Sequence, residues 1–177
     1  MNRIIVICGL ISGVLVSTFM VASMAVCYQK ESFEGNMLLG YSAMLLSFSM
    51  VFVGIKNYRD KYNNGPFSFG KAFKIGLYIT LVASTVYVVV WLIDYYLFIP
   101  DFMDKYTAHL LKQFQAEGPT AAELDAKVTE LADYKEMYRN PLVVILWTYA
   151  EILPVGLVVT LISALILKKP GAEVRPA

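Results

Sequence analysis

The fold class is decided by residues 142–167, which read LVVILWTYAEILPVGLVVTLISALIL. Glu151 is the only charged residue in this run. An α-helix needs about 20 consecutive apolar residues to cross roughly 30 Å of hydrocarbon, and this run is longer than that. Lipid offers no partner to an unsatisfied backbone N–H or C=O, so a segment of this kind crosses the membrane as a helix.

Three further apolar stretches, working outward from this one, have no charged residue between Arg3 and Lys30, between Glu34 and Lys56, or between Lys74 and Asp94. We place the four membrane-spanning helices at about Ile4–Cys27, Met37–Ile55, Phe73–Phe98 and Leu142–Leu167. The composition agrees, because 58% of the residues are hydrophobic and 16% are charged, against roughly 45–50% and about 25% in a soluble domain. We therefore predict an all-α integral membrane protein, with residues 1–177 forming a single four-helix domain in the lipid bilayer.

The first run also has features of a secretory signal peptide. Arg3 supplies a basic start, and Ser23-Met24-Ala25 is a tolerable cleavage site. Its apolar stretch exceeds the usual signal core of about 7–15 residues, however, and three more spans follow it. We therefore prefer an uncleaved first span.

The distribution of Lys and Arg predicts the orientation. With four crossings, nine basic residues fall on one side: Arg3, Lys56, Arg59, Lys61, Lys71, Lys74, Lys168, Lys169 and Arg175. Loops on the cytoplasmic side carry the excess of Lys and Arg. We therefore expect both termini to be cytoplasmic. The net charge of +1 gives no general attraction to nucleic acid.

The segment 101–140 between spans three and four predicts a structure of its own. Phe102, Tyr106, Leu110 and Phe114 recur at four-residue spacing, which indicates one face of a helix. Gly118-Pro119 interrupts that pattern, and Thr120 with Glu123 matches a capping box at the start of a second helix. Its amphipathic face is Leu124, Val128, Leu131, Tyr134 and Tyr138. We expect an extracytoplasmic antiparallel helical hairpin.

Two interpretations of this hairpin stay open. Its apolar stripes can bury against each other or lie on the lipid surface, or they can form a docking surface for a partner. The hairpin has eight acidic and five basic residues, and this acidic excess disfavours attraction to an anionic lipid surface. We expect the hairpin to stand away from the headgroups.

Three stretches of the sequence carry a resemblance to a known family. They are Val53-Gly54-Ile55-Lys56-Asn57-Tyr58-Arg59-Asp60-Lys61, Ser68-Phe69-Gly70-Lys71-Ala72-Phe73-Lys74 and Glu151-Ile152-Leu153-Pro154-Val155-Gly156. The chain resembles the domain of unknown function 4199 family of small bacterial membrane proteins, from the first span to Lys168. The resemblance implies this topology and a bacterial inner membrane, and it supplies no catalytic residues.

Glu151 and Pro154 form the first candidate functional site. Glu151 falls near the middle of the bilayer, where a charged side chain costs about 2.5–3.5 kcal/mol and usually faces the bundle interior. Pro154 removes a backbone donor and crowds the carbonyl of Ala150, which predicts a kink. The pair suits a proton or cation path. Equally, it suits a structural carboxyl hydrogen-bonded to Ser84, Thr85 or Tyr87, and we favour the structural interpretation.

Asp94 is a second candidate near the outer interface. It lies within about one and a half turns of Ile99, so we expect it to reach water or to pair with Arg139 as a structural anchor.

Gly9 and Gly13 form a GxxxG pair that Ser17 extends along the same face of the first span. Small residues of this kind allow close helix approach, either within the bundle or between the two copies of a dimer.

The sequence contains little that would support a conventional catalytic site. His109 is the only histidine, and no Cys lies near it. Cys8 and Cys27 lie about 28 Å apart by helix rise and cannot bond to each other. No GxSxG, HExxH or Walker-type motif occurs. We therefore expect no catalytic residue, no metal and no cofactor.

Two functions follow from these features, and an intramembrane enzyme is a third for which nothing in the sequence names the reaction. The first is a non-enzymatic inner-membrane protein whose hairpin contacts envelope proteins or other copies of itself. The second is a small transporter or ion-conducting protein that uses Glu151 as its protonatable group. A tight bundle of four helices leaves little room for a substrate path, which counts against transport by a monomer.

Overall fold

The computed structural model describes residues 3–30, 33, 37–62 and 66–169. The described part of the chain is helical except for short connections. Its elements are α1 (Arg3–Lys30), α2 (Met37–Tyr62), α3 (Phe69–Ile93), the π-helical turn η1 (Asp94–Phe98), α4 (Phe102–Ala116), α5 (Ala121–Met137) and α6 (Pro141–Leu167). The all-α fold is therefore confirmed. Arg175, one of the basic residues that predict the orientation, lies outside the described residues.

Four helices are long and apolar enough to cross a membrane. They are α1, α2, α6 and the continuous stretch Phe69–Phe98 that joins α3 to η1. The first two continue past the predicted ends of their spans and include polar and charged residues up to Lys30 and Tyr62. Long basic side chains can keep their stems against apolar surface while the charge reaches water, so a helix need not stop where its apolar run stops.

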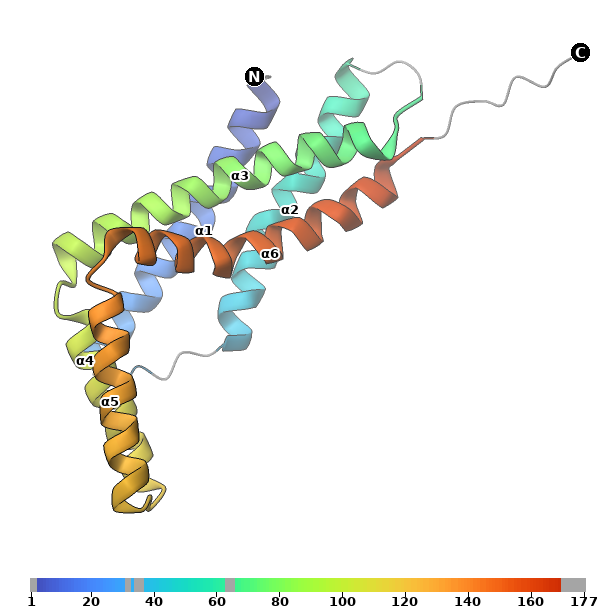
Figure 1. Cartoon of the computed structure of the whole chain (residues 1–177). Helices are drawn as coiled ribbons and strands as arrows, with labels where there is room; N and C mark the ends of the chain where they lie inside the picture. Colours follow the sequence, from blue (N-terminus) through green and yellow to red (C-terminus); the bar gives the residue numbers. More distant parts are fainter. Residues whose placement is uncertain (1–2, 31–32, 34–36, 63–65, 170–177) are drawn as a thin grey trace, which may run out of the picture.

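The four long helices pack as two crossing layers, α1 with α2 and α3 with α6 (Figure 1). The helix pairs with the most extensive contact are α1 with α3 and α3 with α6. The beginnings of α1 and α3 and the ends of α2 and α6 lie at one end of the bundle (Figure 1). We call this the basic end, because the described Lys and Arg residues outside the hairpin gather there, Lys30 excepted. The opposite end is called the hairpin end.

The basic end is closed by a backbone contact that joins distant parts of the chain. Phe67 and Lys169 exchange two backbone hydrogen bonds of 2.9 and 2.8 Å. The Phe67 side chain is fully buried. Ser68 then caps α3, as its sequence position suggests, by accepting a hydrogen bond from the backbone N–H of Lys71. The link between α2 and α3 is thus tied to the end of α6.

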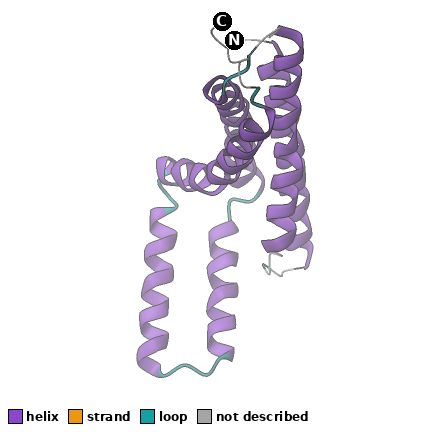
Figure 2. Ribbon diagram, turned by 90° about the vertical axis from the view of Figure 1, so that its right-hand side faces the viewer, coloured by secondary structure: helices purple, strands orange, loops and turns teal. Residues whose placement is uncertain are grey.

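The α4–α5 hairpin projects from the other end of the bundle (Figure 2). The two helices lie side by side, and residues 117–120 connect them. Gly118 has a φ of +75°, a conformation that suits glycine. The Thr120–Glu123 capping box is formed in full, with both the side chain of Thr120 and that of Glu123 accepting backbone hydrogen bonds.

Candidate functional site

The beginning of α6 fixes the depth of Glu151. The Asn140 side chain accepts a hydrogen bond of 3.0 Å from the backbone N–H of Leu142, and Pro141 occupies the first helical turn. Proline suits this position because its missing N–H has no intrahelical partner there. Glu151 lies ten residues after Pro141, or about 15 Å along the helix axis, near the middle of a span.

The Glu151 side chain does not form the hydrogen bonds expected from the sequence. Thr85 Oγ1 instead donates to the carbonyl of Leu81 at 2.8 Å and lies 2.9 Å from the Tyr149 hydroxyl. Ser84 Oγ is buried without a hydrogen-bond partner. In the described part of the chain, the Glu151 carboxylate has neither a hydrogen bond nor an ion pair, and its side chain is exposed. The structural interpretation of Glu151 required a hydrogen bond to Ser84, Thr85 or Tyr87, and the structure does not contain it.

The rotation of α6 explains this difference. Thr148 and Ile152 are buried and lie one turn apart on the face that packs into the bundle. Tyr149 follows Thr148 on one flank of this face, and Glu151 precedes Ile152 on the other flank. Because Tyr149 takes the contact with Thr85, Glu151 points away from Thr85.

Two tyrosines lie close enough to Glu151 to be affected by its charge. Tyr87 of α3 and Tyr138 at the end of α5 both interact with the charge of Glu151. Tyr138 also receives a long hydrogen bond of 3.5 Å from the hydroxyl of Tyr134. The pKa of Tyr138 is raised well above its ordinary value by burial first, and then by Tyr134 and by the charge of Glu151. The site thus joins two long helices to the base of the hairpin.

Pro154 lies inside α6 without ending it. The ribbon of α6 bends in its N-terminal half, as a proline in a helix interior predicts (Figure 1). Proline has no N–H, so the carbonyl of Ala150 lacks its regular helical donor. The structure therefore places an unsupported carbonyl one residue from the unpaired carboxylate of Glu151.

A layer of close contacts lies next to Glu151 on the side of the basic end. Gly156 allows this packing, because a Cβ there would lie 2.4 Å from Thr80 Cγ2 and 2.9 Å from the ring of Phe48. Thr80 Oγ1 lies 3.3 Å from the Gly156 carbonyl and 2.9 Å from Thr160 Oγ1. Thr80, Phe48 and Thr160 are fully buried.

Asp94 differs from its sequence-based expectation. It is 8% exposed, and its Oδ2 atom is buried without a hydrogen-bond partner. Arg139 pairs with Glu136, at 2.8 Å, and not with Asp94. Asp94 follows the buried residues Tyr87 and Trp91 by seven and three positions, so helical spacing places it on the same buried face. The π-helical turn η1 begins at Asp94, where the backbone N–H of Ile99 bonds to the carbonyl of Asp94 at 2.9 Å.

The base of the hairpin is an aromatic cluster that sequence reasoning missed. We call it the junction cluster, and its members are Tyr28, Phe33, Trp91, Tyr95, Phe102, Tyr106 and His109. Phe33 contacts four of these rings at centroid distances of 5.6 to 6.3 Å. Edge-to-face aromatic pairs contribute roughly 0.5–1.5 kcal/mol beyond the area they bury. The aromatic residues at the predicted interface were the available signal, although spacing alone does not show which rings meet.

A polar contact set lies beside the junction cluster. Lys105 Nζ is 2.8 Å from Asp101 Oδ2 and lies over the Tyr28 ring, 4.5 Å from its centroid. The Tyr28 hydroxyl donates to Asp101 Oδ1 at 3.3 Å. The hydrogen bond from Lys105 lowers the pKa of the Asp101 carboxyl. The first turn of α4 is thus fastened to the end of α1.

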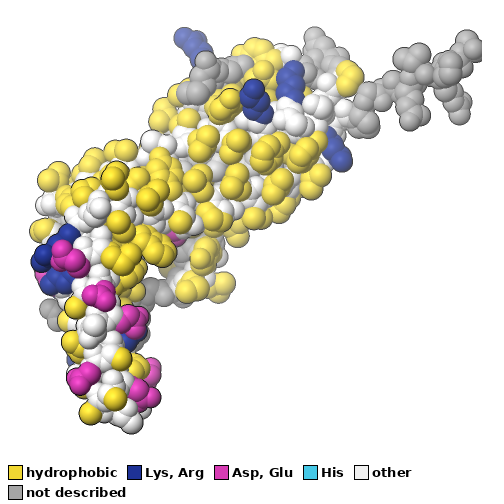
Figure 3. Space-filling model, viewed as in Figure 1, with side chains coloured by type: hydrophobic (Ala, Val, Ile, Leu, Met, Phe, Trp, Pro, Cys, Tyr) yellow, Lys and Arg dark blue, Asp and Glu magenta, His cyan; other side chains and the backbone are white. Residues whose placement is uncertain are grey.

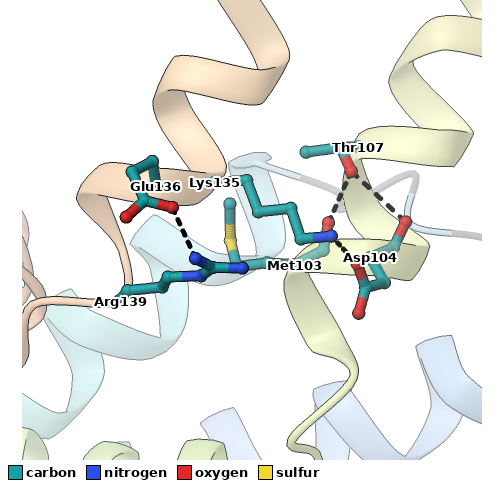
Figure 4. A network of polar contacts seen from close by, with 6 residues as sticks. All are labelled: Met103, Asp104, Thr107, Lys135, Glu136 and Arg139. Carbon is teal, nitrogen blue, oxygen red and sulfur yellow. Dashed lines mark hydrogen bonds and ion pairs between the residues drawn. The ribbon is translucent and has the colours of Figure 1, made fainter.

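The hairpin itself is held by few buried groups. Leu131 is the only buried residue of α5, and Val128 of its predicted apolar face is 46% exposed. Asp104 and Lys135 form an ion pair between the two helices (Figure 4). A shallow groove of about 210 Å³ runs between the helices, lined by Asp104, Thr107, Ala108, Leu111, Val128, Leu131, Ala132 and Lys135. The apolar stripes therefore bury each other only in part.

The small residues of α1 meet α3 of the same chain. A Cβ on Gly9 would lie 2.6 Å from Val82 Cβ, and one on Gly13 would lie 2.7 Å from Val86 Cβ. Ser17, on the same face, is buried, and its Oγ atom has no hydrogen-bond partner. This face is occupied within the bundle, so a dimer formed through it would have to displace α3.

The side chains that could bind a metal ion do not come together in the part of the chain that the structure describes. No group of three His, Cys, Asp or Glu side chains there could hold a metal ion. His109 packs against Phe33, with ring centroids 5.9 Å apart. Cys8 and Cys27 are both free.

Comparison with known proteins gives one family. A family model described as "Protein of unknown function (DUF4199)" matches residues 7–169. Neither a curated protein nor a solved structure matches the chain.

Proposed function

The chain belongs to the DUF4199 family, and we propose that it is a non-enzymatic inner-membrane protein of bacteria that binds a basic envelope protein through its α4–α5 hairpin. In this proposal both chain termini are cytoplasmic and the hairpin stands outside the cytoplasm. The supporting observation is a projecting hairpin on which three exposed acidic side chains form no ion pair among the described residues.

The placement of charge supports this orientation. In Figure 3, Lys and Arg side chains lie at the upper end of the face and on the hairpin, hydrophobic side chains cover the middle, and acidic side chains concentrate on the hairpin. Cytoplasmic ends of spanning helices carry the excess of basic residues. A reporter that is active only outside the cytoplasm should therefore work at Gly118 and fail after Lys169. The reverse pattern would overturn the orientation.

The ion pairs of the hairpin leave an acidic surplus. Four of its five basic side chains pair with acids: Lys105 with Asp101, Lys127 with Glu130, Lys135 with Asp104 and Arg139 with Glu136. Glu117, Asp125 and Asp133 are exposed and take part in no ion pair among the described residues. Exposed charges of one sign steer the approach of an oppositely charged partner. This surplus favours a basic protein and disfavours an anionic lipid surface.

The test is capture of partners by the tagged full chain from native membranes. The triple variant Glu117→Gln, Asp125→Asn, Asp133→Asn should lose the partner, and added salt should weaken its binding to wild type. Lys112→Gln is the matched control, because it removes an exposed hairpin charge and leaves the acidic surplus larger. It should bind at least as well as wild type. Retention of the same partner by the triple variant at equal yield would refute the charge-based proposal.

Transport is the second candidate function. The observation that favours it is the unpaired Glu151 carboxylate at mid-span, next to the bend at Pro154. Ionisable residues inside a membrane commonly mark ion or proton paths. Proton flux into liposomes that contain the pure protein, and its loss in a folded Glu151→Gln variant, would support this function. Absence of flux in both forms would reject it.

A further inference from the structure

Glu151 poses a physical problem that a single chain does not solve. A carboxyl group at mid-span needs a hydrogen-bond partner or a counter-charge, because hydrocarbon supplies neither. Exposed hydroxyls in the spans meet the same need within their own helix, as Thr18 of α1 does by donating to the carbonyl of Val14 at 2.8 Å. The exposed Glu151 carboxylate has no hydrogen bond and no ion pair among the described residues. Its partner therefore has to come from outside the single chain.

Glu151 belongs to a row of exposed residues that runs along most of α6. We call this row the α6 seam, and its members are Trp147, Glu151, Pro154, Val158, Leu161 and Leu165. They recur at alternating steps of four and three residues, the spacing by which one helix packs along another. All six are exposed, and the members other than Glu151 and Pro154 are 42% to 52% exposed. The seam extends over about 27 Å of helix axis, which is close to the thickness of the hydrocarbon.

The described part of the chain leaves this seam open. The opposite face of α6, which carries Ile152 and Gly156, packs against α2 and α3. No other helix passes in front of α6 in Figure 1. The small-residue face of α1 is different, because Gly9 and Gly13 are already covered by α3. The α6 seam is therefore available to a helix of another molecule.

The depth of Glu151 indicates which molecule this is. Glu151 is the only Asp, Glu, His, Lys or Arg within residues 4–29, 37–55, 75–93 and 142–167. Copies of one chain insert into the membrane with the same orientation, so a symmetric pair has its two-fold axis along the membrane normal. Equivalent residues then lie at equal depth. A second copy whose α6 seam faces the first brings its own Glu151 to the level where a polar partner is missing.

Two facing carboxyl groups form a favourable contact in lipid when they hold a proton between them. Two like charges in one apolar site do not both stay ionised, so at least one carboxyl group is protonated and donates its O–H to an oxygen of the other. Hydrogen bonds of this charge-assisted kind are short and strong. The exposed residue Ala150 offers a second acceptor, because Pro154 leaves its carbonyl without the regular helical donor.

We propose that two copies of the chain associate in the membrane through the α6 seam, and that their Glu151 carboxyl groups hydrogen-bond to each other at mid-span. The apolar members of the seam supply the packing around this contact. The inference goes beyond the proposed binding of an envelope protein, and it requires neither a partner of the hairpin nor proton transport.

The first test maps the contact by disulfide cross-linking of the full chain in native membranes. Cys8→Ser and Cys27→Ser remove the native thiols, and Val158→Cys places one thiol in the α6 seam. Leu46→Cys is the matched control, because Leu46 is 74% exposed on α2, outside the seam. A mild oxidant should join two copies roughly tenfold more efficiently at Val158→Cys, since a disulfide needs Cα atoms within about 7 Å. Equal yields, or a disulfide to a different protein alone, would overturn the proposal.

The second test measures the strength of the pair with the pure full chain in liposomes. Energy transfer between fluorophores at the C-terminus is followed as the protein is diluted with lipid. Glu151→Gln should keep the pair, because an amide both donates and accepts hydrogen bonds. Glu151→Leu should raise the dissociation constant about fivefold or more, the size of effect that polar contacts have between model membrane helices.

The folding of the variants is controlled separately. An excess of detergent separates the copies, so the melting temperature measured there belongs to the single chain, and neither variant should melt below wild type. Equal dissociation constants for wild type and Glu151→Leu would show that the carboxyl groups do not hold the pair. Absence of energy transfer from wild type at every lipid ratio would show that the chain is a monomer. Either result would overturn the proposal and leave the proposed function of the hairpin untouched.

Discussion

The two halves of the contact between α2 and α6 differ in how closely the helices pack. Toward the basic end, Phe48, Val51, Ile55 and Ile79 are 0% exposed, and glycines bring the helices into direct contact. Toward the hairpin end, the first turns of α2 stay unpacked, and Leu38 is 78% exposed. Gly156 of α6 lets Phe48 of α2 and Thr80 of α3 approach closely at the packed half of this contact.

The largest expected effect comes from removing a ring in the filled half. Phe48→Ala deletes a fully buried side chain and should destabilise the chain by about 3 kcal/mol through the cavity that it leaves. Leu46→Ala is the matched control on the same helix, where the side chain is 74% exposed, and it should change little. The check is thermal unfolding in detergent. Equal losses in the two variants would contradict the difference between the halves.

A matched pair of glycines sharpens the same comparison. Gly156→Ala puts a Cβ within 2.4 Å of Thr80 and 2.9 Å of Phe48, and overpacking of this kind costs about 1–3 kcal/mol. Gly40→Ala meets nothing within 4 Å, and it should leave the melting temperature unchanged or slightly raised, because alanine favours helix. A drop for Gly40→Ala as large as that for Gly156→Ala would mean that the hairpin end is also filled.

The hairpin should behave as a third region with a stability of its own. Thr120→Ala removes the cap of α5 and should lower the stability of the hairpin by about 1 kcal/mol. Faster hydrogen exchange in residues 102–137, with the bundle unchanged, is the expected result. Faster exchange throughout the chain would show that the hairpin and the bundle unfold together.

The capping box also predicts how acid affects the hairpin. Hydrogen bonds from Thr120 lower the pKa of the Glu123 carboxyl. Its contribution is therefore present above the ordinary glutamate pKa and is lost as the pH falls through the lower folded value. The difference in hairpin exchange between wild type and Glu123→Gln should disappear in strong acid. A difference that grows in acid would contradict this sign.

The smallest effect on stability is expected at Glu151. Glu151→Gln should leave the melting temperature nearly unchanged, because the carboxylate has no partner to lose in the described residues. Glu151→Leu should be neutral or stabilising, since a polar contact between membrane helices is worth only about 0.6 kcal/mol on average. A large loss in either variant would show that the carboxyl has a structural partner after all.

Sequence reasoning reached the parts of this fold that local chemistry decides. The apolar runs located the four long helices, and Thr120 with Glu123 marked the start of α5, because a cap needs only a short-range hydrogen bond. The rotation of α6 was not accessible in this way. It depends on which small residues meet across helices, such as Gly156 with Thr80, and that pairing is tertiary.

The same limit applies at both ends of the bundle. Phe67 and Lys169 are about a hundred residues apart in sequence, and nothing near either one predicts the backbone bonds between them. Phe33 lies in a short connection, although its ring joins four others at the base of the hairpin. Asp94 was misjudged for a different reason, because its distance from the end of the span was considered and its place on the buried face of Tyr87 and Trp91 was not.

The difference between the two halves can be measured along one helix. Backbone hydrogen exchange of the full chain in a bilayer compares residues 142–153 of α6 with residues 155–167 on either side of Pro154. Faster exchange in residues 142–153 is the expected result, because Pro154 removes the helical hydrogen bond to the carbonyl of Ala150, whereas Gly156 and Thr160 beyond it pack tightly against α2 and α3. Equal protection along the whole of α6, or faster exchange in residues 155–167, would contradict the account.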